Sequence, residues 1–194
     1  MRKASLIILL ILLCVVLFSI VAVFKKPLLQ IAFLNVGAGN AVLVTTPSGN
    51  RILIDGGPDQ SVLQALGGEM PFYSRSIDVV LATSQKSSDT GGLPFVLERF
   101  NIGAFIDSGL SPKTTTYRTL LDDVGEKNIA HITANIGEDV NLGGGAHFLI
   151  LSSGAEITGR IVYGATFISI PSDIPATSTS DVVFESDGKN IWEK

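Results

Sequence analysis

The chain lacks several features on which whole classes of protein depend. It has one cysteine in 194 residues, so no disulfide can form within the chain, and a disulfide-stapled scaffold is excluded. Charged residues make up 16% of the sequence, and it contains neither an internal repeat nor a low-complexity segment. This composition excludes a coiled coil and a disordered tail. The length suits one ordinary domain and is too short for two comfortable ones.

Basic residues are scarce outside the N-terminal region. Four of the 14 Lys and Arg residues lie at positions 2, 3, 25 and 26, and the other 10 face 18 Asp and Glu residues. Residues 27–194 therefore carry a net charge of about −8. A domain with that charge has no long-range attraction for phosphate backbones, which excludes a basic nucleic-acid clamp.

One long apolar run is present, and it predicts a membrane anchor. Ser5–Phe24 comprises 20 uncharged, almost wholly apolar residues. A helix of 20 residues is about 30 Å long, which matches the hydrocarbon core of a bilayer. A cleaved signal peptide is the alternative, but its apolar region is usually about 7–15 residues long and ends in a small-x-small pattern that is missing here. Cys14 follows a leucine within the run, which disfavours a lipid-attachment site.

The expected organisation is one transmembrane helix within residues 1–26, followed by a domain over residues 27–194. The basic residues on the two sides of the apolar run are nearly balanced, so the positive-inside comparison gives little guidance. The very short segment before the run favours an N-terminus inside the cell. We therefore expect a single-pass protein of the cell membrane with the bulk of the chain on the extracytoplasmic side.

The remaining sequence predicts a mixed α/β domain. Three short strands joined by turns come first, and helices then interleave with further strands, as in a sheet packed against helices. Strands are expected at 28–34, 41–46, 51–54, 77–82, 104–107, 130–133, 139–142, 146–151, 181–185 and 190–192. Helices are expected at 61–66, 94–100 and 117–127. A Pro-, Ser- and Thr-rich loop over 171–180 precedes the last two strands, which nothing after them covers.

Three motifs occur in a characteristic order. Residues 33–41 read F-L-N-V-G-A-G-N-A, residues 53–57 read L-I-D-G-G, and residues 83–93 read T-S-Q-K-S-S-D-T-G-G-L. They resemble the F-L-D-V-G-Q-G-D-A, L-I-D-G-G and T-H-P-H-A-D-H-I-G-G-L motifs of the metallo-β-lactamase fold, in the form found at the C-terminal end of the competence protein ComEC. The resemblance extends from about residue 33 to residue 151. It implies an αββα sandwich, incomplete here because the family's later ligand stretches would begin near residue 194.

The chain departs from the family at the positions that bind metal. The resemblance implies three histidines and one aspartate that hold two zinc or manganese ions, but this sequence has Ser84, Lys86, Ser88 and Asp89 there. Zinc binds imidazole, thiolate or carboxylate groups, whereas an ammonium has no lone pair and repels a dication. Metal-bound water is the family's nucleophile, so that chemistry is lost. We expect no metal, no other cofactor and no catalytic residue.

A residual site could involve Asp55 and Asp89. Asp55 is interpreted either as a turn aspartate that accepts backbone N–H groups, which we favour, or as a carboxylate supporting a site. Lys86 and Asp89 are three residues apart and could form an ion pair in which the ammonium replaces the missing metal charge. The two histidines, His131 and His147, occupy strand patterns and are interpreted as structural. Trp192 is predicted to lie in the core.

Three functions remain open. The first is a membrane-anchored, non-catalytic domain used for binding or scaffolding, with the membrane and an unidentified protein as partners. The second is a hydrolase of the phosphodiesterase or nuclease type, with Asp55 and Asp89 in a rebuilt metal site. The third is a truncated remnant of a ComEC-like protein. We favour the first, because the motif glycines that fix backbone geometry are present while the ligands are absent. Nucleic acid is implied by the resemblance and disfavoured by the acidic charge.

Overall fold

The computed structural model describes residues 11–14, 28–170 and 181–194. Most of the expected transmembrane helix and the whole expected loop over 171–180 lie outside these residues. Within the part of the chain that is described, no helix is both long enough and apolar enough to span a bilayer.

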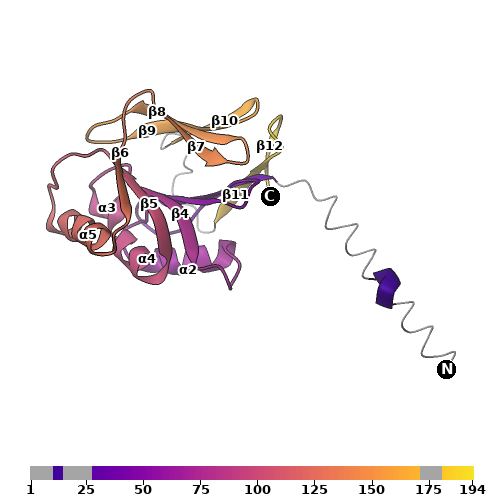
Figure 1. The fold of residues 1–194 in the computed structure, drawn as a ribbon, viewed down its shortest axis with the longest axis horizontal. Helices are drawn as coiled ribbons and strands as arrows, with labels where there is room; N and C mark the ends of the chain where they lie inside the picture. The colour runs from indigo at the N-terminus through magenta and orange to yellow at the C-terminus, as the bar shows by residue number, and fades with distance from the viewer. Residues whose placement is uncertain (1–10, 15–27, 171–180) are drawn as a thin grey trace.

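An eight-stranded mixed sheet forms the centre of the domain (Figure 1). Its order is β12-β11-β1-β2-β3-β4-β5-β6, with antiparallel pairing from β12 to β3 and parallel pairing from β3 to β6. The strands are β1 (Leu29–Phe33), β2 (Val42–Thr45), β3 (Arg51–Ile54), β4 (Ser76–Leu81), β5 (Asn101–Asp107), β6 (Ala130–Thr133), β11 (Val182–Ser186) and β12 (Ile191–Glu193). The expected strands of this sheet are confirmed to within three residues at each end.

The helices lie in the connections between the parallel strands. They are α2 (Ser61–Glu69), α3 (Ser87–Thr90), α4 (Leu93–Arg99) and α5 (Thr115–Glu126). α5 begins where the Thr114 side chain accepts a hydrogen bond from the Tyr117 N–H at 3.1 Å, as an N-cap residue does. Its apolar positions Tyr117, Leu120 and Val124 are buried, which confirms the amphipathic pattern of the sequence.

A second, four-stranded antiparallel sheet covers the other face of the large sheet (Figure 1). Its order is β10-β9-β8-β7, built from β7 (Asp139–Gly143), β8 (Ala146–Ser152), β9 (Thr158–Tyr163) and β10 (Thr166–Ile170). The hairpin between β7 and β8 turns at Gly143–Gly145, where all three glycines have positive φ. The sequence patterns did not predict β9 and β10.

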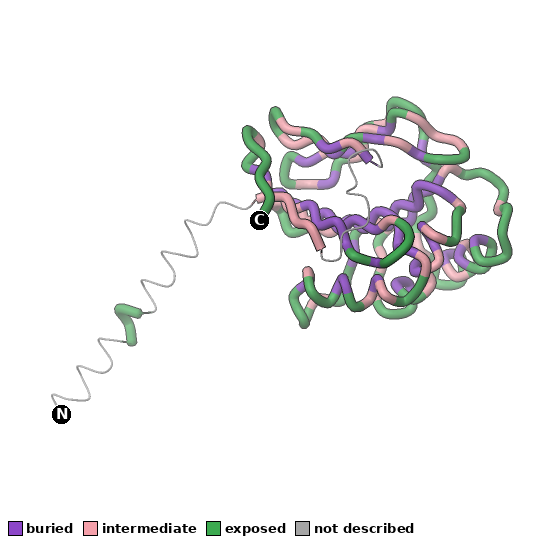
Figure 2. The backbone as a smooth tube through the Cα atoms, turned by 180° about the vertical axis from the view of Figure 1, so that it is seen from behind, coloured by how far each residue is buried: buried purple, intermediate pink, exposed green. Residues whose placement is uncertain are grey.

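The large sheet is buried on both faces, which divides the core in two (Figure 2). Along β3, Leu53 faces the helices, while Ile52 and Ile54 face the second sheet. This alternation follows from the two-residue period of a strand. The helices α2, α4 and α5 all contribute to the first core, and no described helix contributes to the second. The described domain is therefore an αββ arrangement, in which the second helical layer of the expected αββα sandwich is not seen.

The last two strands join the large sheet beside β1. β11 pairs antiparallel with β1, and the rings of Phe33 and Phe184 meet edge to face with centroids 5.8 Å apart. The expected final strand pair is thus confirmed, and it extends the large sheet beyond β1. Trp192 lies on the edge strand β12 with 39% of its surface exposed, so its predicted place in the core is wrong. β12 is the edge strand of the sheet and pairs only with β11 among the described strands.

The motif glycines allow two loops to approach each other closely. Gly92 lies against the loop after β3, and a Cβ atom at Gly92 would overlap the backbone oxygens of Gly56 and Asp59. The Gly92 N–H donates to the Gly57 carbonyl at 2.9 Å. A residue without a side chain is needed here because the two backbones are in contact.

We predict that Gly92→Ala destabilises the domain by about 3 kcal/mol, since two rigid backbone segments would have to separate. Gly125→Ala is the control, because Gly125 lies inside α5 with αR backbone like the N-cap Gly92, and a Cβ there meets no other atom within 4 Å. That control should be neutral or stabilising by up to about 1 kcal/mol. Urea unfolding of both variants measures the difference, and equal stabilities would contradict the close approach.

Candidate functional site

The expected site residues gather at one edge of the large sheet. β3, β4, β5 and β6 run parallel, so their C-terminal ends meet at the same edge. Asp55 follows β3, Thr83 and Ser84 follow β4, and Asp107 ends β5. The short helix α3 continues from this edge and carries Ser88 and Asp89.

Asp55 is fully buried and holds the start of the next loop. Its carboxyl oxygens accept hydrogen bonds from the Thr83 N–H at 2.8 Å and the Thr83 hydroxyl at 2.5 Å. Its φ of +59° places it in the left-handed region, which is uncommon for a residue with a side chain. Accepting a backbone N–H is what we expected of a turn aspartate.

The surroundings of Asp55 disfavour its ionised form. Burial raises the pKa of Asp55 from 3.8 to about 8, and the negative charges of Asp89 and Glu156 add to this, while the two hydrogen bonds from Thr83 lower it. Desolvation is the largest cause, because a carboxylate without solvent loses its hydration energy. The backbones of the two segments are also in contact, since the Gly56 N–H donates to the Asp89 carbonyl at 2.6 Å.

Asp89 is bonded by the hydroxyl groups at two of the positions where the family has ligands. Ser84 donates to one of its carboxyl oxygens at 2.6 Å and Ser88 to the other at 3.2 Å. The Ser84 hydroxyl also accepts the Lys86 N–H at 3.1 Å. Ser84 and Asp89 are both buried, so this network replaces solvent around the carboxyl group.

Lys86 does not pair with Asp89, and the expected ion pair is wrong. Its ammonium lies 3.8 Å from Glu156, at the surface, with both side chains substantially exposed. A surface pair of this kind contributes little to stability, about 0–1 kcal/mol. Asp89 instead accepts hydrogen bonds from the Ser84 and Ser88 hydroxyls, which no pattern in the sequence predicts.

The segment between β8 and β9 closes over this edge of the sheet. Glu156 forms an isolated antiparallel bridge with Ser84, and the Ile157 N–H donates to the Thr83 carbonyl at 2.7 Å. Ile157 is itself fully buried. Residues more than 70 positions apart in sequence are thus hydrogen-bonded across the edge that carries Ser84 and Asp89.

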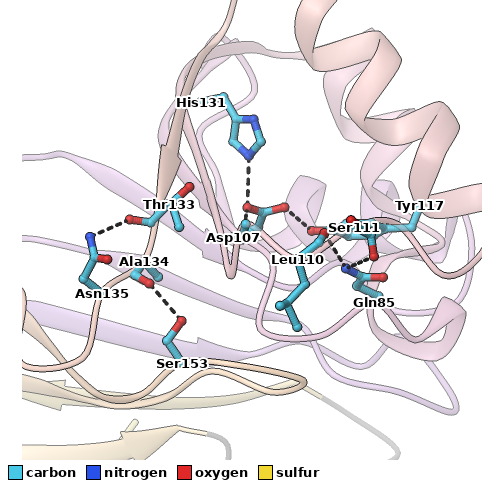
Figure 3. Close-up of polar contacts among 11 residues, drawn as sticks. Gln85, Asp107, Leu110, Ser111, Tyr117, His131, Thr133, Ala134, Asn135 and Ser153 are labelled. Carbon is cyan, nitrogen blue, oxygen red and sulfur yellow. Dashed lines mark hydrogen bonds and ion pairs between the residues drawn. The ribbon is translucent and has the colours of Figure 1, made fainter.

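A second polar cluster, which the sequence analysis did not identify, surrounds Asp107 (Figure 3). The buried Asp107 side chain accepts from the Tyr117 hydroxyl at 2.7 Å and the Gly109 N–H at 2.8 Å, and it contacts Nε2 of His131 at 3.0 Å. Burial and the bond to Asp107 raise the pKa of Tyr117, which keeps its hydroxyl protonated as a donor. The His131 ring therefore bonds Asp107, while the His147 ring contacts Asp139 at 3.0 Å on the second sheet.

Neighbouring loops are fixed by side-chain bonds to backbone oxygens (Figure 3). The Gln85 amide donates to the carbonyls of Leu110 and Ser111 at 3.1 and 3.4 Å, and its oxygen accepts the Lys113 N–H at 2.8 Å. Ser153 donates to the Ala134 carbonyl at 2.8 Å. These contacts join the loop after β4 to the loop after β5, and the loop after β6 to the loop after β8.

The residues present do not fit the pair of metal ions that the fold implies. Among the described residues, no group of three or more His, Cys, Asp or Glu side chains is arranged to hold a metal. Both histidines are paired with carboxyl groups elsewhere, and the oxygens of Asp55 and Asp89 are already occupied by hydroxyl and N–H donors. A divalent ion would have to displace these donors and would find no imidazole or thiolate ligand.

Comparison with known proteins identifies the fold. No family model matches the sequence, and no curated protein matches it. A solved metallo-β-lactamase from Cronobacter sakazakii, a mutant of the HARLDQ-motif enzyme, is similar over 68% of this chain and 56% of its own length, with 14% identity and a TM-score of 0.51. Zn²⁺-bound PqqB from Methylobacterium extorquens has 17% identity over 67% of this chain and 47% of its own, with a TM-score of 0.49. A diphosphatase of the PhnP family has 18% identity over 66% and 50%, with a TM-score of 0.45.

The chain spans about half the length of these structures. At this level of identity, the similarity to the Cronobacter sakazakii enzyme shows a shared fold and does not show a shared activity. The domain has the metallo-β-lactamase fold, as the three motifs implied.

The raised pKa of Asp55 predicts a pH dependence of stability. A carboxyl group whose pKa is higher in the folded state binds its proton more tightly there, so the free energy of unfolding falls as the pH rises from about 4 to about 8. The fall is at most about 1.4 kcal/mol per pH unit. Asp55→Asn removes this slope, which urea unfolding at pH 5 and pH 8 measures.

Asp59→Asn is the control for this experiment. Asp59 is exposed, and hydrogen bonds from the Ser61 N–H and side chain lower its pKa, so it does not titrate between pH 5 and pH 8. The control should keep the slope of the unaltered protein. A slope that survives Asp55→Asn would show that another group is responsible.

Proposed function

We propose that this domain is a non-catalytic metallo-β-lactamase fold that serves for binding or scaffolding. The proposal rests on the hydrogen bonding of Asp89. Among Ser84, Lys86, Ser88 and Asp89, this is the side chain that could coordinate a metal. Its two carboxyl oxygens are held by Ser84 and Ser88, at positions where the relatives have ligands. A pocket whose donors bond each other has no open coordination position at which to activate water.

The closure of the site supports the same function. Ser84 and Asp89 are 4% and 5% exposed, and the backbone bridge from Glu156 to Ser84 lies over them. A substrate would have to open this bridge before reaching either side chain. The alternative, a phosphodiesterase-type hydrolase with Asp55 and Asp89 as ligands, requires carboxyl oxygens that are free to coordinate, whereas those of Asp55 accept hydrogen bonds from Thr83 and those of Asp89 from Ser84 and Ser88.

Metal content tests this proposal. Purified full-length protein, incubated with zinc or manganese and then freed of excess ion, is expected to retain less than one metal per chain by mass spectrometry. It should not hydrolyse bis(p-nitrophenyl) phosphate above the rate of buffer. Stoichiometric metal together with turnover would favour the hydrolase, and that turnover should then be lost in Asp89→Asn.

A variant with restored ligand types serves as the positive control if the unaltered chain binds no metal. The quadruple substitution Ser84→His, Lys86→His, Ser88→Asp and Asp89→His introduces the ligand types that the motif has in its relatives. If the unaltered chain lacks metal because of its donor set, this variant should bind more zinc than the unaltered chain at the same protein concentration. Equal, low zinc binding by both proteins would indicate that the closed entrance, and not the donor set, prevents metal binding.

We also propose that the domain is held outside the cytoplasmic membrane by residues 5–24, as a relative of the ComEC C-terminal domain. The support is the 20-residue apolar run with basic residues on both sides. The acidic charge of the domain argues against nucleic acid as its partner, because phosphates would be repelled. This leaves a protein as the proposed partner.

Membrane attachment is tested by fractionation and a reporter. Full-length protein should stay in the membrane pellet after extraction at alkaline pH, because a spanning helix is not removed by loss of electrostatic attachment. Alkaline phosphatase fused after Lys194 should be active, since it folds on the extracytoplasmic side. A fusion that is active while the protein is released as a shortened, soluble chain would indicate a cleaved signal peptide instead.

A further inference from the structure

A large hollow lies on the helical side of the domain, away from the site described above. It is an open groove of about 770 Å³ between α2, α4 and the segment that joins α2 to β4. Leu63 and Gly67 of α2 and Phe100 after α4 line it. A second open hollow shares Phe95 with it and continues along α2 towards Asp59. The two together form one groove across the outside of the helical layer.

Exposed aromatic side chains gather at this groove. Five aromatic residues are exposed in the described part of the chain, and three of them belong to this region, namely Phe72, Tyr73 and Phe95. Phe72 is 90% exposed and packs only edge to face against Tyr73, with ring centroids 5.4 Å apart. Large apolar side chains grouped beside a concave surface are typical of a protein interaction site.

The groove also carries two basic side chains within an acidic domain. Arg75 and Arg99 line it together with Phe72, and Glu98 is the acidic residue among the lining residues. Both arginines are exposed, and no ion pair of either is found among the described contacts. An arginine guanidinium forms bidentate bonds to carboxylates, so these two side chains are complementary to acidic groups.

Gly67 leaves part of the wall without a side chain. It lies inside α2, where glycine costs about 1 kcal/mol relative to alanine. A Cβ atom at Gly67 would meet nothing within 4 Å, so no internal packing requires glycine at this position. The bare backbone widens the groove at its middle, where an incoming side chain could approach the helix.

We propose that this groove binds a peptide segment of a partner protein that carries a large apolar side chain next to two or more carboxylates. The apolar side chain fills the groove between Phe95 and Phe100, over Gly67, and the carboxylates bond Arg75 and Arg99. The concave shape selects a protruding segment rather than a flat membrane surface. This inference deepens the proposed binding role by giving it a surface and a partner chemistry.

Peptide selection tests the proposal. Random 12-residue peptides displayed on phage are selected against full-length protein in nanodiscs of uncharged lipid, and the enriched peptides are synthesised. They should contain an aromatic or large aliphatic residue with neighbouring Asp or Glu. Their affinity should fall at least about tenfold in the double variant Arg75→Glu and Arg99→Glu, because two charge pairs become repulsive. It should also fall in Gly67→Leu, whose side chain occupies the groove.

Arg118→Glu with Lys127→Glu is the matched control. Both residues are exposed, on and just after α5, and the change in net charge is the same while the groove is untouched. The selected peptides should bind this control as they bind the unaltered protein. The proposal is wrong if the peptides lack acidic residues, if both double variants bind equally, or if no peptide is enriched and the protein instead associates through Phe72 with phosphatidylglycerol vesicles.

The outcome can be separated from that of the proposed function. Metal content and phosphodiester hydrolysis are measured on the same Arg75→Glu, Arg99→Glu protein and should equal those of the unaltered chain. A failure of peptide binding with no metal bound would reject the groove and leave the non-catalytic role intact. Metal and turnover in the unaltered chain would reject the non-catalytic role whatever the groove binds.

Discussion

Two buried carboxyl groups at the end of parallel strands must be satisfied without solvent, and the rest of the site follows from how this is done. Asp55 is bonded by Thr83, and Asp89 by Ser84 and Ser88. A buried polar group without a partner costs about 1–3 kcal/mol, so these donors are required once the carboxyl groups are buried. The same donors occupy the oxygens that a metal would need. The carboxyl oxygens can therefore either accept these internal hydrogen bonds or coordinate a metal, and they cannot do both.

The double-faced sheet explains why such a pocket keeps its shape. Helices bury one face of β3, β4 and β5, and the second sheet buries the other, so the strand ends cannot shift independently. The bridge from Glu156 and the Gln85 bonds to the loop after β5 add fixed points at the rim. In this arrangement the fold supplies a rigid frame, and the chemistry of the frame depends only on which side chains are placed at its edge.

Much of the fold could be predicted from local pattern, and much of the site could not. Strand alternation and turn residues located β1 to β8 and α2, α4 and α5, because these elements have clear periodicity and sharp ends. β9 and β10 were missed, since polar and glycine residues interrupt their apolar alternation. The structure places Asp55 and Asp89 on adjoining segments, where the Gly56 N–H donates to the Asp89 carbonyl at 2.6 Å. Glu156 and the Asp107–Tyr117–His131 cluster depend on contacts between distant segments, which no local pattern encodes.

The hydroxyl network also limits how the chain can change. A single substitution that returns an imidazole at position 84 would remove the shortest donor to Asp89 and place a bulkier ring beneath the Glu156 bridge. Each intermediate on a path towards a metal-binding pocket would thus carry a partly unsatisfied buried charge and gain no ion in return. A change to a metal-binding pocket would therefore need several exchanges at once, because each single exchange weakens the packing of the buried edge before any ion can bind.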